Sequence, residues 1–285
     1  MAQTKFENAE HVEQNEDRPR SAGQELIAYL DGHDGLMSQS ESLAQAQRVI
    51  RKIVAGEHDR PSLVAQIASE IGAEIVEAVL PPGHDLNTVE LARRYKTSRT
   101  PVREALILLE REGLVEIPPR RRPRAHEHSI QEVRELYVTR TVIFELIATE
   151  VASLAEPEDI ALLDSIVVRM GQAVEKNDIA AFSWLSVEFH DKDTLISRNK
   201  TAKRIHDSLL LRTLPIRRLS LSQPGRMQKS LEDHIQLVKA YKSHDSVLAG
   251  AIIRANHIAA LQAVQDYSAQ AGGPLIAPKS SCGAE

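Results

Sequence analysis

Residues 97–115, TSRTPVREALILLEREGLV, constrain the fold more than any other stretch of this 285-residue chain. Pro101 has no backbone N–H and fits only the first turn of a helix, so the helix is predicted to begin at Ser98 or Thr100. Gly113 stands where a left-handed residue ends a helix. Four apolar residues recur at i, i+3, i+4 and i+7 and predict one buried stripe: Val102, Ala105, Leu106 and Leu109. The stretch therefore predicts a short helix with a basic, hydroxyl-rich start and one apolar face.

The residues around this helix predict a compact domain over residues 61–128. A first helix over about 62–79 ends at the breaker LPPGHDL. A second starts at Asn87, where Glu90 follows three residues later as in a capping box. After Gly113, the run LVEIPPRRRPRAHEH predicts two short strands around a Pro/Arg tip. Three helices followed by a hairpin describe a winged helix.

From residue 129 onward the strand signals disappear and amphipathic helices follow. Ser129 and Glu132 form a predicted capping box, and Pro157 fits the first turn of the next helix. We expect helices at about 129–155, 157–176, 178–198, 201–222, 228–243 and 246–268. The predicted fold is mainly α, with an N-terminal winged helix-turn-helix followed by an all-α bundle of six to seven helices over residues 129–268.

The two ends of the chain have a different composition. Residues 1–60 are expected to be a largely flexible extension with short helices at Gln24–Leu30 and Glu41–Val54, the second docked on the body; a partner-binding role is the alternative. Residues 269–285 are expected to be a flexible tail. The single cysteine, Cys282, predicts neither a disulfide framework nor a thiolate metal cluster. With no run of about 18 apolar residues and no signal peptide, we expect a soluble cytoplasmic protein without a membrane partner.

Basic side chains are concentrated in one region of an acidic chain. Residues 91–124 hold ten Lys and Arg against four Asp and Glu, a net charge of +6 where the whole chain has −5. A helix start rich in N–H and hydroxyl groups binds phosphate, and Arg can bridge O6 and N7 of guanine in the major groove. The alternative is a solvated helix face, in which Arg99 and Arg103 pair with Glu104 and Glu110.

The run LNTVELARRYKTSRTPVREALILLEREGLVEIPP closely resembles the winged helix-turn-helix of the GntR family of bacterial transcription regulators. In that family the residues that match Ser98, Arg99, Thr100 and Arg103 contact operator DNA, and the wing reaches the minor groove. The resemblance implies the same role for these four residues and for Arg120, Arg121 and Arg122 in the wing. Two departures stand out: Lys96 replaces the usual glycine and is expected to take a left-handed turn while adding a phosphate contact, and the wing PPRRRPRA has no glycine.

The helical half resembles the FadR-type effector domain (FCD domain) of the same family, and the likeness to the family runs from about Pro61 to Tyr267. That domain is a bundle of six or seven helices that dimerises and encloses a small-molecule cavity, often with a divalent metal. The resemblance implies a homodimer whose effector is a small molecule, expected to be a carboxylate.

Arg140 occupies a place in the inward stripe of the helix that begins at Ser129. A buried guanidinium needs a partner, because an unpaired buried charge is very costly. That partner is either a protein carboxylate or an anionic ligand, and the sequence leaves both open. In the family, the matching arginine commonly faces the effector cavity.

Inward-facing histidines predict a candidate metal site in the bundle. His190, with Ser186 one turn earlier, His234 and His257 stand on separate helices, and three such histidines would make an open imidazole site for Zn or Ni. Vacant positions on that ion would take a ligand carboxylate, so Ser186, His190 and His234 are expected to contact the effector together with Arg140. The family's metal-binding members use one Asp and three His. Here Ser186 stands in the place of the Asp, and the family spacing lands on Asn256, one residue before His257. The alternative for each histidine is a core residue whose ring nitrogens are satisfied, and Trp184 is expected to be packing rather than a ligand platform.

The residues and the resemblance together predict a dimeric DNA-binding regulator, expected to be a repressor, whose affinity for operator DNA changes when a small organic acid or related metabolite binds the helical domain. Two alternatives belong to other classes. One is a metal-dependent enzyme built on the histidine-containing bundle, for which no nucleophile–base pair or phosphate loop is found. The other is a protein that binds DNA without sequence preference.

Overall fold

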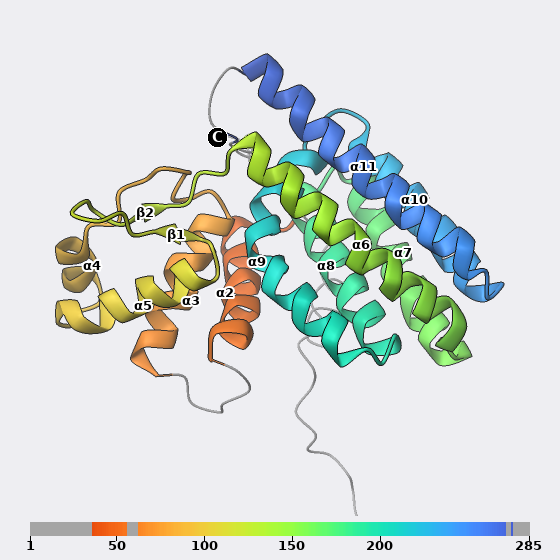
Figure 1. Cartoon of the computed structure of the whole chain (residues 1–285), viewed down its shortest axis with the longest axis horizontal. Coiled ribbons are helices and arrows are strands. Elements are labelled where there is room, and N and C mark those ends of the chain that lie inside the picture. The colour runs from red at the N-terminus through yellow and green to blue at the C-terminus, as the bar shows by residue number, and fades with distance from the viewer. Residues whose placement is uncertain (1–35, 56–61, 272–274, 276–285) are drawn as a thin grey trace, which may run out of the picture. The chain divides into compact units, whose positions relative to one another are not determined.

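A computed structural model describes residues 36–55, 62–271 and 275 (Figure 1), and these residues fall in one compact unit. Its first helices are α2 (Gln39–Ala55), α3 (Leu63–Val76), α4 (Thr88–Arg94) and α5 (Arg99–Arg111). A short hairpin follows, formed by β1 (Val115–Glu116) and β2 (Arg124–Ala125). The remaining helices are α6 (Ile130–Leu154), α7 (Pro157–Glu175), α8 (Ile179–Ile196), α9 (Lys200–Leu221), α10 (Arg226–Lys242) and α11 (Ser246–Ala271). The predicted fold class, a winged helix-turn-helix followed by an all-α bundle, is confirmed.

The DNA-binding-type domain forms as the sequence predicts. Ser98 is the N-cap of α5, Gly113 takes a left-handed φ of 73°, and β1 pairs with β2 antiparallel with Val115 opposite Ala125. The four stripe residues, Val102, Ala105, Leu106 and Leu109, are fully buried. They attach α5 to α3, where Gly72 lets the side chains of Leu109 and Ile50 approach the backbone closely.

Lys96 and Arg120, at the two places where the family has glycine, are among the non-glycine residues with a left-handed backbone. Lys96 has a φ of 50° in the turn between α4 and α5, as expected from the sequence. At the tip of the wing, the N–H of Arg121 donates to the carbonyl of Pro118, and Arg120 has a φ of 60°. Proline at the second turn position and a positive φ at the third are typical of a type II turn. The wing therefore keeps a tight turn without glycine, at a strain of about 1 kcal/mol at Arg120.

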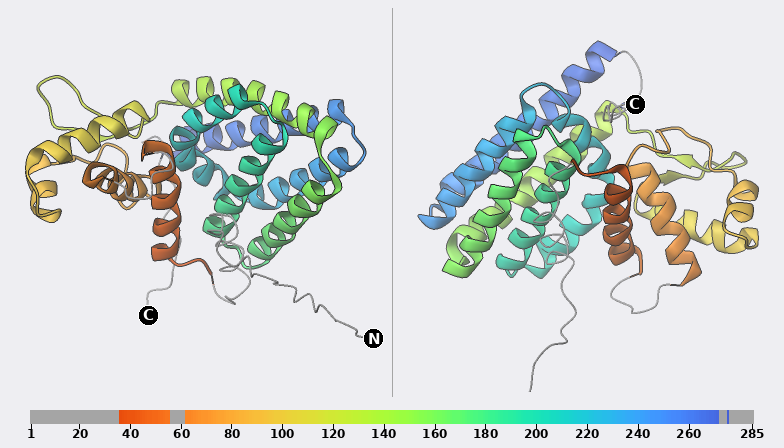
Figure 2. Two further views of the ribbon diagram at one scale, coloured as in Figure 1. Left: turned by 90° about the horizontal axis from the view of Figure 1, so that it is seen from below. Right: turned by 180° about the vertical axis from the view of Figure 1, so that it is seen from behind.

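The bundle is organised around α6 and α11, which run side by side (Figures 1 and 2). The predicted capping box of Ser129 and Glu132 starts α6, and Pro157 stands in the first turn of α7. The ion pair of Arg254 with Glu145 joins α11 to α6. A buried cluster joins α6, α9 and α11 and contains Val133, Tyr137, Ile216, Leu219, Ala260 and Val264.

Helix α2 is the helix predicted within 41–54, and it packs on α3 and contacts α8. The indole N–H of Trp184 donates to Ser42 Oγ at 2.9 Å, and the N–H of Met37 donates to Asp178 Oδ2 at 2.5 Å. Trp184 is buried in this contact, so its packing role is confirmed. The other predicted helix of the extension, Gln24–Leu30, and Cys282 lie outside the described residues, and the boundaries of the flexible ends stay predictions.

Two side chains of α9 contact the DNA-binding-type domain. Arg218 forms an ion pair with Glu77, which caps the C-terminal end of α3. Arg212 donates to the carbonyl of Arg111 at 3.0 Å, at the end of α5. Helix α9 is therefore a direct connection between the bundle and the helices of the winged domain.

The sequence predicted that no segment is long and apolar enough to span a bilayer, and this prediction is wrong for α11. Residues 246–270 are long enough and apolar enough, a test of length and composition only. One face of α11 instead packs against α6 and α10 and buries Ala249, Ile253, Ala260 and Val264. Val247, Leu248 and Ile258 of the same segment are exposed, so packing in the bundle accounts for only part of this apolar composition.

Candidate nucleic-acid interface and ligand cavity

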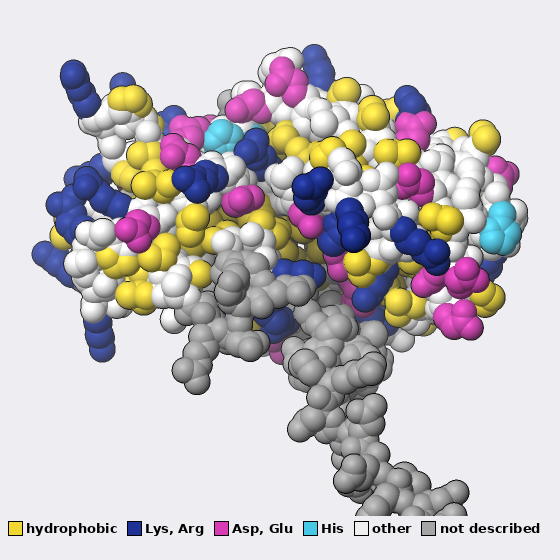
Figure 3. Space-filling model, turned by 60° about the horizontal axis from the view of Figure 1, so that its bottom comes forward, with side chains coloured by type: hydrophobic (Ala, Val, Ile, Leu, Met, Phe, Trp, Pro, Cys, Tyr) yellow, Lys and Arg dark blue, Asp and Glu magenta, His cyan; other side chains and the backbone are white. Residues whose placement is uncertain are grey.

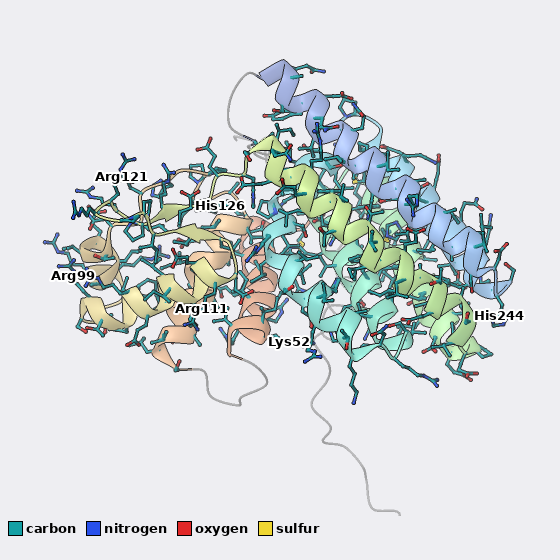
Figure 4. The ribbon with its side chains drawn as sticks, viewed as in Figure 1. Lys52, Arg99, Arg111, Arg121, His126 and His244 are labelled. Atoms are coloured by element: carbon teal, nitrogen blue, oxygen red, sulfur yellow. The ribbon has the colours of Figure 1, made fainter. Side chains whose placement is uncertain are left out.

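All eight side chains predicted to contact DNA are exposed. They are Lys96, Ser98, Arg99, Thr100, Arg103, Arg120, Arg121 and Arg122. Figure 3 shows Lys and Arg side chains gathered at the left edge, over the part that carries α4, α5 and the wing, and in Figure 4 Arg99 and Arg121 project outward there. The structure therefore brings the start of α5 and the wing tip to one basic region.

Most of these basic groups remain available to a polyanion. The side chain of Ser98 makes no capping hydrogen bond, and Arg99 Nη2 lies 3.4 Å from Thr88 Oγ1, a long contact. Arg122 reaches Asp85 only at 4.0 Å, on the surface. In contrast, Arg94 and Arg124 are engaged by Glu74 and Glu116. An exposed helix start carrying hydroxyls, N–H groups and guanidiniums can bind phosphates and reach base edges, as a recognition helix does.

Three of the four predicted effector residues, Arg140, Ser186 and His190, line a small cavity in the bundle. The fourth, His234, does not line it, although its ring lies 5.4 Å from that of His190. His257, predicted as a metal ligand, lines the cavity too. Asn256 lines it too, although its amide is held by Asp233 Oδ2 at 2.8 Å. The cavity has a volume of about 30 Å³, which is room for a water molecule.

Three buried arginines meet at this cavity: Arg140, Arg217 and Arg226. Among the described residues, none of them forms an ion pair with a carboxylate, whereas the buried Arg169 is paired with Glu188 at 3.0 Å. Arg217 Nη1, Arg226 Nε and Arg226 Nη1 are buried without a hydrogen-bond partner. The sequence left the partner of Arg140 open between a protein carboxylate and an anionic ligand, and no carboxylate among the described residues forms an ion pair with it.

Burial weakens the charged state of all three arginines, and the charge of Arg140 weakens that of Arg217 further, whereas Asp233 favours the charged state of Arg226. Burial lowers the pKa of Arg140 to about 10, and burial together with the charge of Arg140 lowers the pKa of Arg217 to about 9. Both stay protonated at neutral pH, so the cavity wall is strongly positive. A bound anion would relieve this repulsion and satisfy the unpaired N–H groups.

The histidines at the cavity are neutral. Burial, with the charges of Arg140 and Arg217, lowers the pKa of His257 well below the ordinary value, and burial lowers that of His234 to about 4. His234 Nδ1 lies 2.6 Å from the carbonyl of Ser230, so Nδ1 is the donor, and Nε2 has no partner. His257 Nδ1 is likewise buried without a partner. These nitrogens have lone pairs free to accept a hydrogen bond.

The residues at this cavity do not fit a metal ion. The expected carboxylate is replaced by Ser186, and Arg217 Nη2 donates to its Oγ at 2.6 Å, which brings a cation to that place. Within the part of the chain that the structure describes, one group of three His or carboxylate side chains has ligand atoms all within 4.8 Å of one another, and it is His126, His128 and Glu132. The histidines of the bundle do not reach this spacing.

Arg217, Arg226 and the group of His126, His128 and Glu132 were missed from the sequence. A signal for Arg217 existed, because it falls in the stripe Leu210, Leu214, Arg217 and Leu221, just as Arg140 falls in an inward stripe of α6. The run HEHSIQE likewise places two histidines and two glutamates within seven residues. Arg226 is the first residue of α10 and follows a left-handed Gly225, so no periodic signal marks it.

Comparisons with known proteins agree on one family. A family model described as "Bacterial regulatory proteins, gntR family" matches residues 63–123, and one described as "FCD domain" matches residues 135–260. The uncharacterized HTH-type transcriptional regulator in the TAR-I ttuE-ttuC' intergenic region of Agrobacterium vitis is 32% identical over 40% of this chain and 68% of the relative. The HTH-type transcriptional repressor RspR of Escherichia coli K12 is 27% identical over 63% of this chain and 79% of the relative. The solved structure of E. coli McbR/YncC has a TM-score of 0.61 at 23% identity and covers 73% of this chain and 100% of that one, a likeness of fold.

Proposed function

Because this chain belongs to the GntR family and is a DNA-binding transcription regulator rather than an enzyme, we propose that it is a cytoplasmic repressor that binds operator DNA as a homodimer and releases it when an anionic small molecule enters the bundle. The observation that carries the ligand part is the meeting of three buried arginines without a carboxylate partner at one cavity. The name of RspR, a transcriptional repressor, supports the direction of regulation.

DNA contact is assigned to the start of α5 and to the wing. Arg99 and Arg103 are exposed and four residues apart, so they share one face of α5 that lies beside the buried stripe. That face is proposed to enter the major groove, with Ser98 and Thr100 on phosphates. Lys96 and the wing arginines 120–122 are then proposed to contact the DNA phosphates or the minor groove on either side of that major groove.

The ligand is proposed to be an organic acid with at least two anionic groups. One carboxylate can accept two parallel hydrogen bonds from a single guanidinium. Three guanidiniums offer more N–H donors than one carboxylate can accept. Ser186, Ser230 and the neutral imidazoles add uncharged hydrogen-bonding groups at or beside the same wall. Because the cavity of about 30 Å³ is too small for such a molecule, the ligand must separate the guanidiniums as it enters.

That separation supplies a route to the DNA-binding domain. Helix α9 carries Arg217 at the cavity, and the same helix carries Arg212 and Arg218, which contact Arg111 and Glu77. A ligand that moves α9 therefore changes the position of the ends of α3 and α5. Only a difference in ligand affinity between the two arrangements can shift DNA binding.

A second copy of the chain is proposed to cover an apolar row on α6. Val138, Val142 and Leu146 stand at i, i+4 and i+8, and Val138 and Val142 are 58% and 60% exposed. One chain carries one winged helix, and a regulator that reads a pseudo-palindromic operator needs two related by a two-fold axis. An isologous contact along this row meets that requirement.

The test is a band-shift titration of the full chain on the promoter next to its own gene, at physiological salt, with unrelated DNA as competitor. We expect a complex that survives the competitor and dissociates when a di- or tricarboxylic acid from a thermal-shift screen is added. Complexes that unrelated DNA removes equally well would favour the alternative of non-specific binding. No complex at all would contradict the proposal.

A further inference from the structure

Three potential metal ligands meet where the wing joins the bundle. His126 directly follows β2, His128 lies in the connecting segment, and Glu132 stands in the first turn of α6. One ligand atom from each lies within 4.8 Å of the others. Figure 4 shows His126 in this position, between the wing and the start of α6. The group lies outside the cavity of Arg140.

The contacts of His126 leave a lone pair facing a carboxylate. Its Nδ1 lies 2.9 Å from Glu116 Oε1, so Nδ1 carries the hydrogen and donates to that oxygen. Its Nε2 then faces Glu132 Oε1 at 3.6 Å. Two electron-rich atoms at this distance repel each other unless a cation lies between them. The pattern of a carboxylate that orients an imidazole toward a cation is that of a histidine metal ligand with its outer-shell partner.

His128 supplies a second free imidazole nitrogen. Its ring lies edge-on to that of His126, with 4.3 Å between the ring centroids, and its Nδ1 is buried without a hydrogen-bond partner. A ring nitrogen with a free lone pair is the atom through which histidine binds a metal ion.

The surroundings favour a cation and give it access. A cleft of about 670 Å³ leads to these residues, and its wall contains four carboxylates, from Glu110, Glu116, Glu132 and Glu135. Among the described residues, Arg212 is the one Lys or Arg on this wall, and Arg124 is held on the far oxygen of Glu116 at 2.7 Å. Negative charge thus exceeds positive charge around the candidate ligands. Glu132 Oε2 is engaged by Ser129 in the capping box, so Oε1 is the oxygen free to bind.

We propose that His126, His128 and Glu132 bind a divalent ion of the zinc type, with Glu116 orienting His126. Two imidazole nitrogens and one carboxylate oxygen are the ligands of Zn²⁺ and related ions, whereas Mg²⁺ and Ca²⁺ prefer oxygen alone. Three protein ligands leave a position for water from the cleft. The ion would tie the end of β2 to the first turn of α6. Its effect on operator binding rests on the proposed function, whereas the binding of the ion does not.

A proton is the competing occupant. A doubly protonated His126 between Glu116 and Glu132 would also remove the repulsion at Nε2. It would leave Nδ1 of His128 without a partner, whereas a metal ion engages both rings. A bound metal ion predicts metal uptake that a His128 variant weakens. A second proton on His126 predicts no metal uptake at this site.

The experiment uses the full, untagged chain, freed of metal with a chelator and titrated with Zn²⁺ against a chromophoric chelator. His128→Gln and Glu132→Gln test the site, and the second keeps the cap of α6 because Gln is also accepted at that position. His244→Gln, which removes a histidine bonded to the carbonyl of Ala152, is the matched control. His190→Gln tests the histidines of the bundle, and circular dichroism checks that each variant is folded.

We expect one equivalent of Zn²⁺ to bind the wild-type chain, at least tenfold weaker binding in both site variants, and no change in the His244 and His190 variants. No uptake by the wild type, or unchanged uptake by a folded Glu132→Gln chain, would overturn the site. Loss of uptake in His190→Gln alone would move the ion to the bundle and would also overturn it. In a band shift, Zn²⁺ should alter operator affinity in the wild type but not in Glu132→Gln. A complex that Zn²⁺ leaves unchanged rejects the regulatory effect alone, and the absence of any complex rejects the proposed function.

Discussion

The guanidinium of Arg217 donates to Ser186 Oγ across 2.6 Å, at the position where metal-binding members of the family carry an aspartate. A cationic side chain thus occupies the neighbourhood of the expected metal, and the cavity is positive through arginines. The hydroxyl of Ser186 accepts a hydrogen bond from Arg217 Nη2, while Arg217 Nη1 is buried without a partner among the described residues. Arg217 Nη1 is therefore available to donate a hydrogen bond to the proposed anionic ligand.

Ser186→Asp should supply that anion from the protein. A carboxylate beside Arg217 forms a charge-assisted hydrogen bond worth about 1.5–3 kcal/mol and repels an incoming acid. We expect a more stable ligand-free chain and at least a tenfold loss of affinity for the acid that binds the wild type best, both measured by thermal shift and calorimetry. Ser186→Asn, similar in size but uncharged, should keep most of the affinity. Equal affinities in the Asp and Asn variants would show that the acid binds elsewhere.

Arg103→Ala should weaken specific DNA binding by about 1–3 kcal/mol, because it removes a base or phosphate contact from the exposed face of α5. The measurement is the dissociation constant on the operator in a band shift at fixed salt. Arg134→Ala removes an equally exposed arginine from α6 and should leave the constant unchanged. If the two variants behave alike, α5 is not the recognition helix.

Lys96→Gly should stabilise the chain and weaken DNA binding at once. The φ of 50° at Lys96 costs a residue with a side chain about 1 kcal/mol that glycine does not incur. Loss of the ammonium group should make the plot of the logarithm of operator affinity against the logarithm of salt concentration less steep by about 1. Lys96→Ala is the matched control, because it removes the charge and keeps the strained backbone. Denaturant unfolding should therefore separate the two variants, and salt titration should not.

The sequence predicted structural features that depend on neighbouring residues, and it missed features that depend on the packing of distant helices. The stripe of Val102 to Leu109, the cap at Ser129 and the left-handed turn at Lys96 are decided by neighbouring residues, and all of them formed as predicted. The three arginines of the cavity come from three helices, and only the packing of α6, α9 and α10 brings them together. Arg140 could be predicted because it stands in an apolar stripe of its helix. Arg226 is the first residue of its helix, where no apolar stripe marks it. The replacement of the Asp by Ser186 was visible in the sequence, but its consequence required the position of Arg217.

Stability should fall as the pH is lowered from about 6.5 to 4, in part through His234. Burial lowers the pKa of His234 to about 4 in the folded chain, while the unfolded chain titrates near 6.5. Between these values the unfolded state binds more protons, so the free energy of unfolding increases with pH, and the contribution of His234 is complete above about 6.5. Urea unfolding at several pH values measures this slope. His234→Gln should reduce it, and an unchanged slope would mean that the imidazole is not neutral in the folded chain.

Val142→Glu should dissociate the proposed dimer. Val142 lies in the middle of the exposed row on α6, and a two-fold contact would place two introduced carboxylates close together in a desolvated interface. Val168→Glu, on α7, is the matched control, because Val168 is 62% exposed against 60% for Val142. Light scattering should give a dimer for the wild type and the control and a monomer for Val142→Glu. Operator affinity should fall with dissociation, because each half-site then binds a single winged helix. A Val142→Glu chain that remains dimeric would place the contact between subunits on another face.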